Sequence, residues 1–400
     1  MSSNFDPIAY INEPRWQKVS LGLIRITRLL ELLGNPQDSL KFVHVAGTNG
    51  KGSTCAFLES ILRNAGYKTG LFTSPYIETF EERIRVGGEN IDMKSLTEAT
   101  LKVRDAAKQV ESETGEHPTE FELMTAVGFL HFANCKCDIC VIEVGLGGRL
   151  DSTNVISPEV SVITPIGLDH VGVLGNTIEE IAYEKAGIIK PHIPVVCADQ
   201  TKEALSVIKE IAGERLILKK ACPLFKMKMA GCYQQSNAEL AACVAKVLAN
   251  QSWQISEDDI LKGIAEASWP ARFEIFSNVI LDGAHNVDGA KVLKQSLEQY
   301  EPEKKRVAVF GVLEDKDYLG ILDQVADMFE KFYIYEPNSP RSLKLDKLDE
   351  IVSRYCNDVA LCKSATDALA QAQQDTKKAD QLVVCFGSLY SCGELRHSLV

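Results

Sequence analysis

Short apolar runs alternate along the chain with stretches whose apolar residues recur at helical spacing. The apolar runs are Phe42–Ala46, Ile139–Val144, Val160–Thr164, Val195–Ala198, Val279–Leu281, Val307–Phe310, Phe332–Tyr335 and Leu382–Phe386. Strands that are apolar throughout are buried on both faces, and such strands separated by amphipathic helices are typical of parallel sheets. The pattern therefore predicts an α/β fold, in which ligands bind beyond the carboxyl ends of the strands.

A break in this alternation divides the chain into two expected domains. Ser268–Phe276 (SWPARFEIF) follows a helical stretch, and its Trp-Pro step marks a linker. We expect residues 1–272 to form a larger domain and residues 273–400 a smaller, Rossmann-like one. Both lengths lie within the ordinary range of domain sizes.

The composition is that of an ordinary globular protein. Of 400 residues, 45% are hydrophobic and 24% are charged, which excludes a disordered or collagen-like chain. The formal net charge of −12 disfavours binding to nucleic acid or to an anionic membrane. An anionic ligand must therefore be held by local groups rather than by the field of the whole protein.

The N-terminal segment and the cysteines indicate a cytoplasmic protein. Met1–Tyr10 has neither the basic nor the apolar region of a signal peptide, and no apolar run approaches the roughly 18 residues of a membrane span. Twelve cysteines scattered through such a chain are expected to be reduced thiols. Cys135, Cys137 and Cys140 lack a second pair at zinc spacing and lead into an apolar strand, so buried thiols are favoured over a zinc site.

One glycine-rich loop joins an expected strand to an expected helix. The strand Phe42–Ala46 runs directly into Gly47–Thr54 (GTNGKGST), and a helical stripe follows. Glycines let backbone N–H groups turn towards an anion, and Lys51 can reach the β- and γ-phosphates of a nucleotide. Gly52 separates this lysine from the hydroxyl groups that can approach Mg²⁺, unlike in the standard phosphate loop. The alternative is a turn with an exposed lysine, and the loop alone does not distinguish a kinase, a GTPase, a ligase or an ATP switch.

Three further polar residues are candidates for the same edge of the sheet. Glu143 comes at the end of an apolar strand, where a carboxylate binds Mg²⁺ or caps a turn, and its position leaves both open. His170 follows another strand, but a lone loop histidine is more often a surface residue. Lys185 lies in the last turn of a helix, so sequence alone favours a cation that complements the helix dipole.

Six segments together resemble one enzyme family. They are HVAGTNGKGST (44–54), TSPYIETFEERIRV (73–86), VIEVGLGGRLDSTN (141–154), ITPIGLDHVGVLG (163–175), YEKAGIIK (183–190) and LDGAHN (281–286). In this order they resemble folylpolyglutamate synthase and dihydrofolate synthase, of the ATP-dependent Mur ligase superfamily. The resemblance implies an N-terminal phosphate-loop ATPase domain of Mur-ligase type that also binds the pterin or folate, and a Rossmann-like glutamate-ligase domain.

The resemblance also implies a reaction. ATP phosphorylates a substrate carboxylate, and the amine of L-glutamate attacks the acyl phosphate and displaces phosphate. The carboxylate belongs to 7,8-dihydropteroate in dihydrofolate synthase and to the terminal glutamate of a reduced folate in folylpolyglutamate synthase. Three anionic partners must meet, which explains cationic and metal sites in an acidic protein.

The family pattern assigns roles to individual residues. The expected nucleotide ligands are Thr48, Asn49, Gly50, Lys51, Gly52, Ser53, Asn237, Arg272 and Asp282. The expected metal ligands are Ser74, Glu143, His170 and a carbamylated Lys185, and the expected catalytic residues are Lys51, His170, Lys185 and His285. The implied cofactors are ATP, Mg²⁺ at two sites and a monovalent cation. The alternatives are purely structural roles: Arg272 is then an exposed charge in the linker, and Asp282 and His285 form an Asp turn in which the histidine is hydrogen-bonded.

A further set is expected to bind the substrates. These residues are Leu21, Gly22, Arg83, Thr119, Glu120, Phe121, Glu122, Leu150, Asp151, Ser152 and Ser388. Phe121 stacks on a flat heterocycle or packs in the core, and Asp151 is expected to accept hydrogen bonds from a pterin. One departure from the family is Ala271, which stands where the W-P-G-R motif usually has glycine.

The resemblance favours an enzyme with both activities. Arg149 lies in GGRLD (147–151), as in bifunctional bacterial enzymes, whereas monofunctional folylpolyglutamate synthases can lack it. The alternatives are a monofunctional folylpolyglutamate synthase, a Mur-type ligase acting on a cell-wall precursor, and a non-catalytic ATP-binding protein. The expected partners are dihydropteroate, folates and L-glutamate, with no nucleic acid or membrane, and the family is commonly monomeric.

Overall fold

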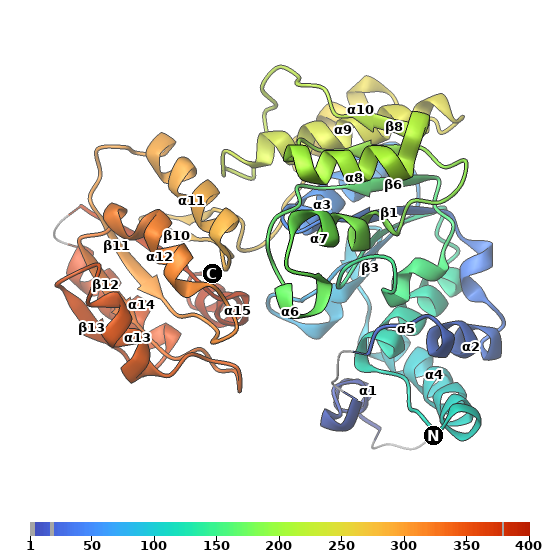
Figure 1. The fold of residues 1–400 in the computed structure, drawn as a ribbon, viewed down its shortest axis with the longest axis horizontal. Helices are drawn as coiled ribbons and strands as arrows, with labels where there is room; N and C mark the ends of the chain where they lie inside the picture. The colour runs from blue at the N-terminus through green and yellow to red at the C-terminus, as the bar shows by residue number, and fades with distance from the viewer. Residues whose placement is uncertain (1–4, 17–19, 378–379) are drawn as a thin grey trace. The chain divides into compact units, whose positions relative to one another are not determined.

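The computed structural model describes residues 5–16, 20–377 and 380–400, which form two compact units (Figure 1). Unit 1 comprises residues 1–76, 80–226 and 236–267, and unit 2 comprises residues 77–79, 227–235 and 268–400. The expected boundary after residue 272 thus differs from the observed one before residue 268, and two short earlier segments also belong to unit 2. Of the N-terminal segment for which no signal peptide is expected, residues 1–4 lie outside the described ones.

Unit 1 is built on a mainly parallel sheet (Figure 1). Its strands, among the described residues, are β1 (Phe42–Ala46), β2 (Thr69–Phe72), β3 (Ile84–Val86), β4 (Glu89–Asn90), β5 (Ile139–Glu143), β6 (Val160–Ile163), β7 (Val195–Cys197) and β8 (Leu216–Leu218). They lie in the order β4-β3-β2-β5-β1-β6-β7-β8, and the β2–β3 and β3–β4 pairs are antiparallel. The predicted apolar strands β1, β5, β6 and β7 occupy interior positions of the sheet, as full burial requires.

The helices of unit 1 pack on this sheet in groups. They are α1 (Pro7–Ile11), α2 (Ile24–Leu32), α3 (Lys51–Asn64), α4 (Met93–Thr114), α5 (Glu120–Cys135), α6 (Val171–Leu174), α7 (Ile178–Ala186), α8 (Lys202–Ala212), α9 (Gln234–Asn250, whose first two residues belong to unit 2) and α10 (Glu257–Glu266). Phe42, Phe72 and Ile142 pack with apolar residues of α2, α4 and α5, and Ala46 and Ile163 pack with those of α7 and α8. Helix α3 contacts β1, β2 and β5.

Unit 2 has helices on both faces of a second sheet. Its strands, in the part of the chain that is described, are β9 (Glu274–Phe276), β10 (Val279–Leu281), β11 (Arg306–Phe310), β12 (Lys331–Ile334), β13 (Val359–Leu361) and β14 (Leu382–Phe386). Their order is β13-β12-β11-β14-β10-β9, with β9 alone antiparallel to its neighbour. Its helices are α11 (Val287–Gln299), α12 (Tyr318–Val325), α13 (Leu345–Val352), α14 (Ala365–Thr376) and α15 (Leu389–His397). Ala308 and Phe310 of β11 pack with α11, α12 and α13, whereas Val307 and Val309 pack with α14 and α15. This alternation confirms the predicted α/β architecture.

Residues 77–79 belong to unit 2 although the chain on both sides of them belongs to unit 1. Ile77 is 7% exposed and lies in the same apolar cluster as Cys392 and Leu395 of α15. Arg396 of α15 donates a hydrogen bond from Nη1 to Glu78 Oε2 at 2.9 Å. The core of unit 2 therefore includes a piece of chain made nearly two hundred residues before β9 begins.

Two properties of the whole chain agree with an ordinary globular protein. All twelve cysteines are free thiols, seven of them buried. Cys137 and Cys140 are among the buried ones, and the Cys135 thiol lies 3.6 Å from His131 Nε2. Among the described residues, no helix combines the length and the apolar composition that crossing a membrane requires.

Ala271 adopts a backbone conformation that favours glycine. Its φ is +54°, its side chain is fully buried, and its carbonyl accepts a hydrogen bond from Gly283 N at 2.8 Å. A side chain with a Cβ is strained in this left-handed region. The residue that departs from the family motif is therefore the residue at which the backbone demands glycine.

We expect the free energy of unfolding of Ala271→Gly to be higher than that of the unaltered protein, or lower by at most about 0.5 kcal/mol. Relief of backbone strain at this position offsets both the lost methyl contact and the greater freedom of the unfolded chain. The matched control is Ala290→Gly, at a fully buried position inside α11. That change is expected to lower the free energy of unfolding by about 1 kcal/mol or more. Urea unfolding of both variants provides the measurement, and equal losses would contradict strain at Ala271.

Candidate active site

Four neighbouring parallel strands bring their carboxyl ends to one edge of the unit 1 sheet. They lie in the order β2, β5, β1, β6. Glu143, at the end of β5, pairs with Val45 of β1, and the next residue of β1, Ala46, pairs with Ile163 of β6. The glycine loop after β1, Glu143 and the segment after β6 therefore start at the same level of the sheet, with Ser74 two residues after β2.

The glycine loop is held in place by the segment that follows β6. The N–H groups of Thr48 and Asn49 both donate to the Pro165 carbonyl, at 2.9 and 3.2 Å. The Thr48 hydroxyl donates to the Gly167 carbonyl at 3.0 Å and lies 3.0 Å from Gly167 N. Gly50 then begins α3 in the left-handed region, with φ of +82°. The first turn of α3 consists of Lys51, Gly52 and Ser53. The loop thus directs a helix N-terminus beyond the edge of the sheet, where backbone N–H groups bind anions.

Two lysines from different elements meet on one carbonyl oxygen of this loop. Lys51 Nζ donates to Gly47 O at 3.2 Å and to Thr48 O at 3.1 Å. Lys185 Nζ, from the last turn of α7, donates to the same Gly47 O at 2.8 Å. The helix-dipole interpretation expects the Lys185 side chain to lie near the last carbonyls of its own helix. In the structure this side chain instead reaches the glycine loop. Burial, reinforced by the positive charge of Lys51, lowers the pKa of Lys185 to about 7.

The residues expected to bind metal are only partly gathered by the structure. Ser74 N donates to Glu143 Oε2 at 3.2 Å, and Glu143 is 4% exposed. His170 begins α6 with φ of +53°, its side chain is 43% exposed, and its Nε2 lies 3.9 Å from Asp169. Within residues 5–16, 20–377 and 380–400, no three His, Cys, Asp or Glu side chains form a ready metal cluster. A Mg²⁺ ion at Ser74 and Glu143 would thus complete its oxygen shell with water or phosphate, as Mg²⁺ does elsewhere.

In unit 2, Asp282 holds a loop together. It follows β10 and is buried, and burial raises the pKa of its carboxyl group. The Tyr233 hydroxyl donates to Asp282 Oδ2 at 2.7 Å, Phe273 N donates to the same oxygen at 2.8 Å, and Ala284 N donates to Oδ1 at 2.8 Å. Tyr233 was not expected at any site, because its partner lies 49 residues away in the sequence.

The other expected residues of unit 2 lie near Asp282 in the sequence or at the start of α15. His285 Nδ1 donates to the Gly283 carbonyl at 2.8 Å, which leaves Nε2 as the acceptor nitrogen of the neutral ring. Arg272 Nη1 donates to the Ala271 carbonyl at 3.1 Å. Ser388 begins α15 and caps it with its hydroxyl group. In unit 1, Asn237 of α9 lies against Gly50 of the glycine loop.

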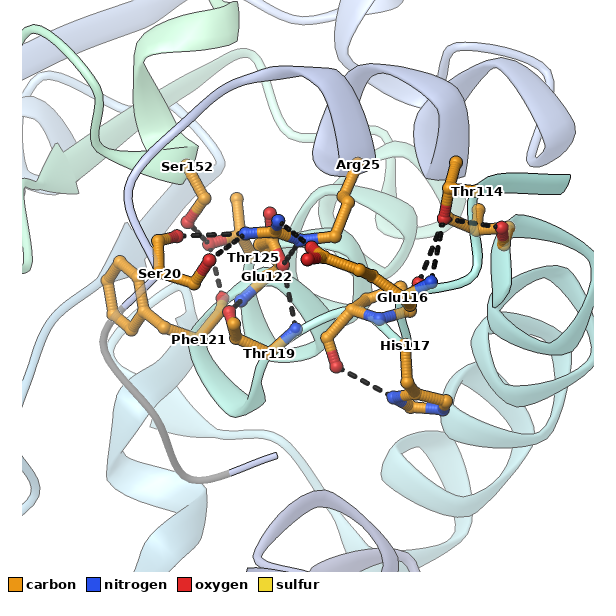
Figure 2. A network of polar contacts seen from close by, with 12 residues as sticks. Ser20, Arg25, Thr114, Glu116, His117, Thr119, Phe121, Glu122, Thr125 and Ser152 are labelled. Atoms are coloured by element: carbon orange, nitrogen blue, oxygen red, sulfur yellow. Dashed lines mark hydrogen bonds and ion pairs between the residues drawn. The ribbon is translucent and has the colours of Figure 1, made fainter. Parts of the chain in front are cut away.

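Three segments expected to bind a pterin are joined by hydrogen bonds, and Figure 2 shows the one between Ser152 and Thr125. Gly22 N donates to the Leu150 carbonyl at 3.4 Å, which links the segment before α2 to the loop after β5. The Ser152 and Thr125 hydroxyl groups lie 2.9 Å apart, which links that loop to α5. Thr119 and Glu122 form a capping box at the start of α5. Leu21 next to Gly22 is 38% exposed.

The Phe121 ring is partly exposed and lies between polar and apolar neighbours. Its Cζ atom is so close to Gly145 that a methyl group there would be 2.4 Å away. The Arg83 guanidinium lies 5.8 Å from the centre of the ring and forms an ion pair with Glu120. Phe72 packs on Phe121 at 5.9 Å between ring centres. Both interpretations of Phe121, stacking and packing, therefore find support in its surroundings.

Asp151 is already occupied by hydrogen bonds from its own chain. Its Oδ2 accepts from Gly145 N at 3.1 Å and from Leu146 N at 2.9 Å. Its Oδ1 accepts from the N–H group of Thr153 at 3.0 Å and from the Thr153 hydroxyl at 2.5 Å. A carboxylate has about four acceptor directions, and all are used here. Asp151 thus fixes the loop after β5, which differs from the expected role as an acceptor for a pterin.

Comparison with known proteins first defines the class. Residues 45–217 match the Mur ligase middle domain, and residues 271–389 match the Mur ligase glutamate ligase domain. Those two regions contain the glycine loop with Lys185 and the loop of Asp282. The fold and the loop are therefore those of a Mur-type ligase, as the sequence motifs predicted.

Relatives over the full chain narrow the class to one family. A dihydrofolate synthase/folylpolyglutamate synthase from Bacillus subtilis is 37% identical over 416 residues, which cover 95% of each chain. Mycobacterium tuberculosis folylpolyglutamate synthase, solved with ADP and AMPPCP, has a TM-score of 0.88 at 29% identity and covers 98% of this chain and 99% of its own. E. coli FolC with DHPP and ADP has a TM-score of 0.87 at 29% identity, covering 98% and 97%. This chain belongs to the dihydrofolate synthase/folylpolyglutamate synthase family.

We expect Gly50→Ala to weaken ATP binding at least about tenfold, or roughly 1.4 kcal/mol. A methyl group at Gly50 would lie 2.5 Å from Asn237 Oδ1 and would distort the loop. Gly66→Ala is the matched control, because Gly66 has a similar φ of +88° against +82° but open space around it. Both variants carry the same backbone strain, so only nucleotide affinity, measured by calorimetry with a non-hydrolysable ATP analogue, should separate them. Equal affinities in the two variants would remove the loop from the nucleotide site.

Proposed function

We propose that this protein uses ATP to join L-glutamate to 7,8-dihydropteroate and to reduced folates, forming an amide in both cases. The observation that carries the proposal is the meeting of Lys51 and Lys185 on the Gly47 carbonyl, at the sheet edge that also holds Glu143. Two lysines, of which Lys185 is buried, and a carboxylate beside a phosphate loop supply the charges that phosphoryl transfer to a carboxylate needs. The protein is an ATP-dependent amide-forming ligase, in keeping with its family.

The reaction has two steps. A carboxylate oxygen of the substrate attacks the γ-phosphorus of ATP, the bond to the bridging oxygen breaks, and ADP leaves with an acyl phosphate remaining. The amine nitrogen of L-glutamate then attacks the acyl carbon, and inorganic phosphate leaves as the amine gives up a proton. Lys51 stabilises negative charge on the phosphates, and the N–H groups of Gly50–Ser53 bind and orient them.

Ser74 and Glu143 fit a Mg²⁺ ion, because a hydroxyl and a carboxylate are hard oxygen ligands and the two residues are already hydrogen-bonded. When bound, Mg²⁺ supplies positive charge that neutralises the nucleotide phosphates. We assign His170 and Lys185 to a second ion. The role of a monovalent cation is supported by the family pattern alone.

Lys185 is the residue that we propose to be carbamylated. Only a neutral amine attacks CO₂; the new N–C bond gives a carbamate, and one proton is released. A pKa lowered to about 7 by burial leaves a large share of the amine neutral at physiological pH. The product is an anion that no longer repels Lys51 and that offers oxygen ligands to Mg²⁺.

We expect carbamate on Lys185 to increase as the pH rises from 6 to 8 at constant CO₂ pressure, because the neutral fraction increases from roughly a tenth to roughly nine-tenths around a pKa of about 7. Carbon-13 NMR with labelled CO₂ provides the measurement. Lys185→Ala should lose the signal and regain part of its turnover with small carboxylates. Lys190→Ala, which removes a partly buried lysine whose pKa is also lowered by burial, should keep the signal. A signal that survives Lys185→Ala would assign the carbamate elsewhere.

The pterin end of the substrate is assigned to the three joined segments around α5. Phe121 offers its partly exposed ring for stacking, beside the ion pair of Arg83 and Glu120. Leu21 and Gly22 are assigned to the same region, because Gly22 is hydrogen-bonded to Leu150. Ser388 at the start of α15 is assigned to the substrate as well.

The bifunctional assignment is supported by Arg149 and by the Bacillus subtilis relative, whose name carries both activities. Arg149 donates to Glu184 Oε1 from Nε and Nη2, at 3.1 and 2.8 Å, and its N–H group donates to the Glu184 carbonyl at 2.7 Å. The arginine therefore fastens the loop that carries Leu150 and Asp151 to the helix that carries Lys185. A monofunctional folylpolyglutamate synthase is the second candidate, since a relative of 36% identity carries that single name.

We expect ADP release with ATP, Mg²⁺ and L-glutamate when either 7,8-dihydropteroate or a reduced folate is supplied in a separate reaction. Turnover with both substrates supports the bifunctional assignment. Turnover with the folate alone makes the protein a folylpolyglutamate synthase and contradicts the inference of two activities from Arg149. A uridine-linked substrate is the control for Mur-type activity on cell-wall precursors. Absence of turnover with both 7,8-dihydropteroate and the folate would overturn the proposed function.

The remaining assignments concern the surroundings of the protein. We propose a monomer in the cytoplasm, whose partners are small molecules only. Twelve free thiols support a reducing compartment, and the net charge of −12 supports the absence of nucleic-acid or anionic-membrane partners.

A further inference from the structure

Arg25, in the first turns of α2, is the centre of a polar network in unit 1 (Figure 2). Its Nη2 donates to the carbonyl and the hydroxyl oxygen of Ser20, each at 2.9 Å. Its Nε donates to Glu122 Oε2 at 3.1 Å, and its Nη1 donates to Glu116 Oε2 at 2.6 Å. The Arg25 side chain is 12% exposed and that of Glu122 is 3% exposed, so this is a nearly buried ion pair.

The two ends of this network belong to two of the segments assigned to the pterin. Ser20 directly precedes Leu21 and Gly22, and Gly22 is hydrogen-bonded to Leu150. Glu122 Oε2 also accepts from Thr119 N at 2.7 Å, so the carboxylate that binds Arg25 is the one that caps α5. One guanidinium thus connects the start of α5 to the segment before α2.

Arginine is the side chain that this connection needs. A planar guanidinium presents several N–H groups in fixed directions, which lets it reach Ser20, Glu122 and Glu116 at once. Lysine has one charged nitrogen and cannot span the same three partners. Glu122 Oε1 is buried and makes no hydrogen bond in the described structure, so loss of Arg25 would leave a buried carboxylate without its counter-charge.

We propose that Arg25 is a positioning residue for the pterin-bearing substrate: through Ser20 and Glu122 it sets the distance between the Leu21–Gly22 segment and the start of α5. The proposal rests on the proposed function. Arg25 does not touch the nucleotide loop, so its effect belongs to the binding of dihydropteroate or folate and leaves the use of ATP unchanged.

The test compares Arg25→Met and Arg25→Lys with the unaltered protein in steady-state kinetics. We expect Arg25→Met to raise KM for dihydropteroate about tenfold, because sub-ångström displacement of a binding wall costs affinity, while kcat changes less than about twofold and KM for ATP stays constant. Arg25→Lys should give an intermediate KM. Equilibrium binding of dihydropteroate, followed by calorimetry, should show the same ranking.

Arg28→Met is the matched control, three residues later on the same helix. Arg28 also binds two glutamates, Glu113 at 2.7 Å and Glu31 at 2.9 Å, but it is more exposed and does not reach Ser20. Its loss should leave both KM values unchanged. Glu116→Gln removes the outer contact of Arg25 only and should likewise leave KM for dihydropteroate unchanged.

The outcomes distinguish failure of the role proposed for Arg25 from failure of the proposed function. An unaltered protein that turns over dihydropteroate, with Arg25→Met equal to Arg28→Met, overturns the role of Arg25 alone. Equal increases of KM for dihydropteroate and ATP would also overturn it, because they indicate general loss of structure. If Arg25→Met does not fold, Arg25→Lys and Ser20→Ala decide, and unchanged KM in both contradicts the proposal. No turnover by the unaltered protein with either substrate overturns the proposed function, and the role of Arg25 with it.

Discussion

The register between β1 and β5 is the constraint on which the candidate active site depends. Successive side chains of a strand point to opposite faces, so a shift of one residue would turn Glu143 to the other face of the sheet and move it along the edge. The paired residues Val45 and Glu143 are buried in the middle of four parallel strands, where apolar contacts on both faces specify the pairing. Ordinary packing of the core therefore holds the Glu143 carboxylate at the same edge of the sheet as the glycine loop.

Cations placed close together at the glycine loop explain how an acidic protein handles anionic substrates. The net charge of −12 repels phosphates and carboxylates at a distance, so attraction must come from groups that face the ligand at short range. The Gly47 carbonyl gathers Lys51, which is partly exposed, and Lys185, which is buried, at one point, and charge acts more strongly where burial excludes water. The low pKa of Lys185 follows mainly from its burial and is reinforced by the positive charge of Lys51.

The sequence was most informative where chemistry follows directly from position along a strand. The apolar runs predicted the interior strands, and the rule that ligands bind beyond strand ends led to the glycine loop and Glu143. The strands that were not predicted, such as β2 (Thr69–Phe72), are short or contain glycine, so their strand character comes from neighbours in the sheet. Arg25 and Tyr233 were missed because their partners lie 97 and 49 residues away, a separation that no local pattern reveals. For Asp151, the residue type alone does not predict whether a ligand is bound, since only the structure reveals that both carboxylate oxygens already accept hydrogen bonds from the chain.

The three residues Ile77–Thr79, together with 227–235, make the chain pass between the two units several times. A gene fragment that ends at residue 272 therefore encodes all of unit 1 together with parts of unit 2, and one that begins at residue 273 lacks residues 77–79, 227–235 and 268–272 of unit 2. The same connectivity orders events during synthesis, since Ile77 leaves the ribosome long before α15, against which its apolar side chain is buried. Until α15 has been made, the Ile77 side chain cannot be buried against it. Unit 1 therefore begins to fold while the segment 77–79 is not yet packed in unit 2.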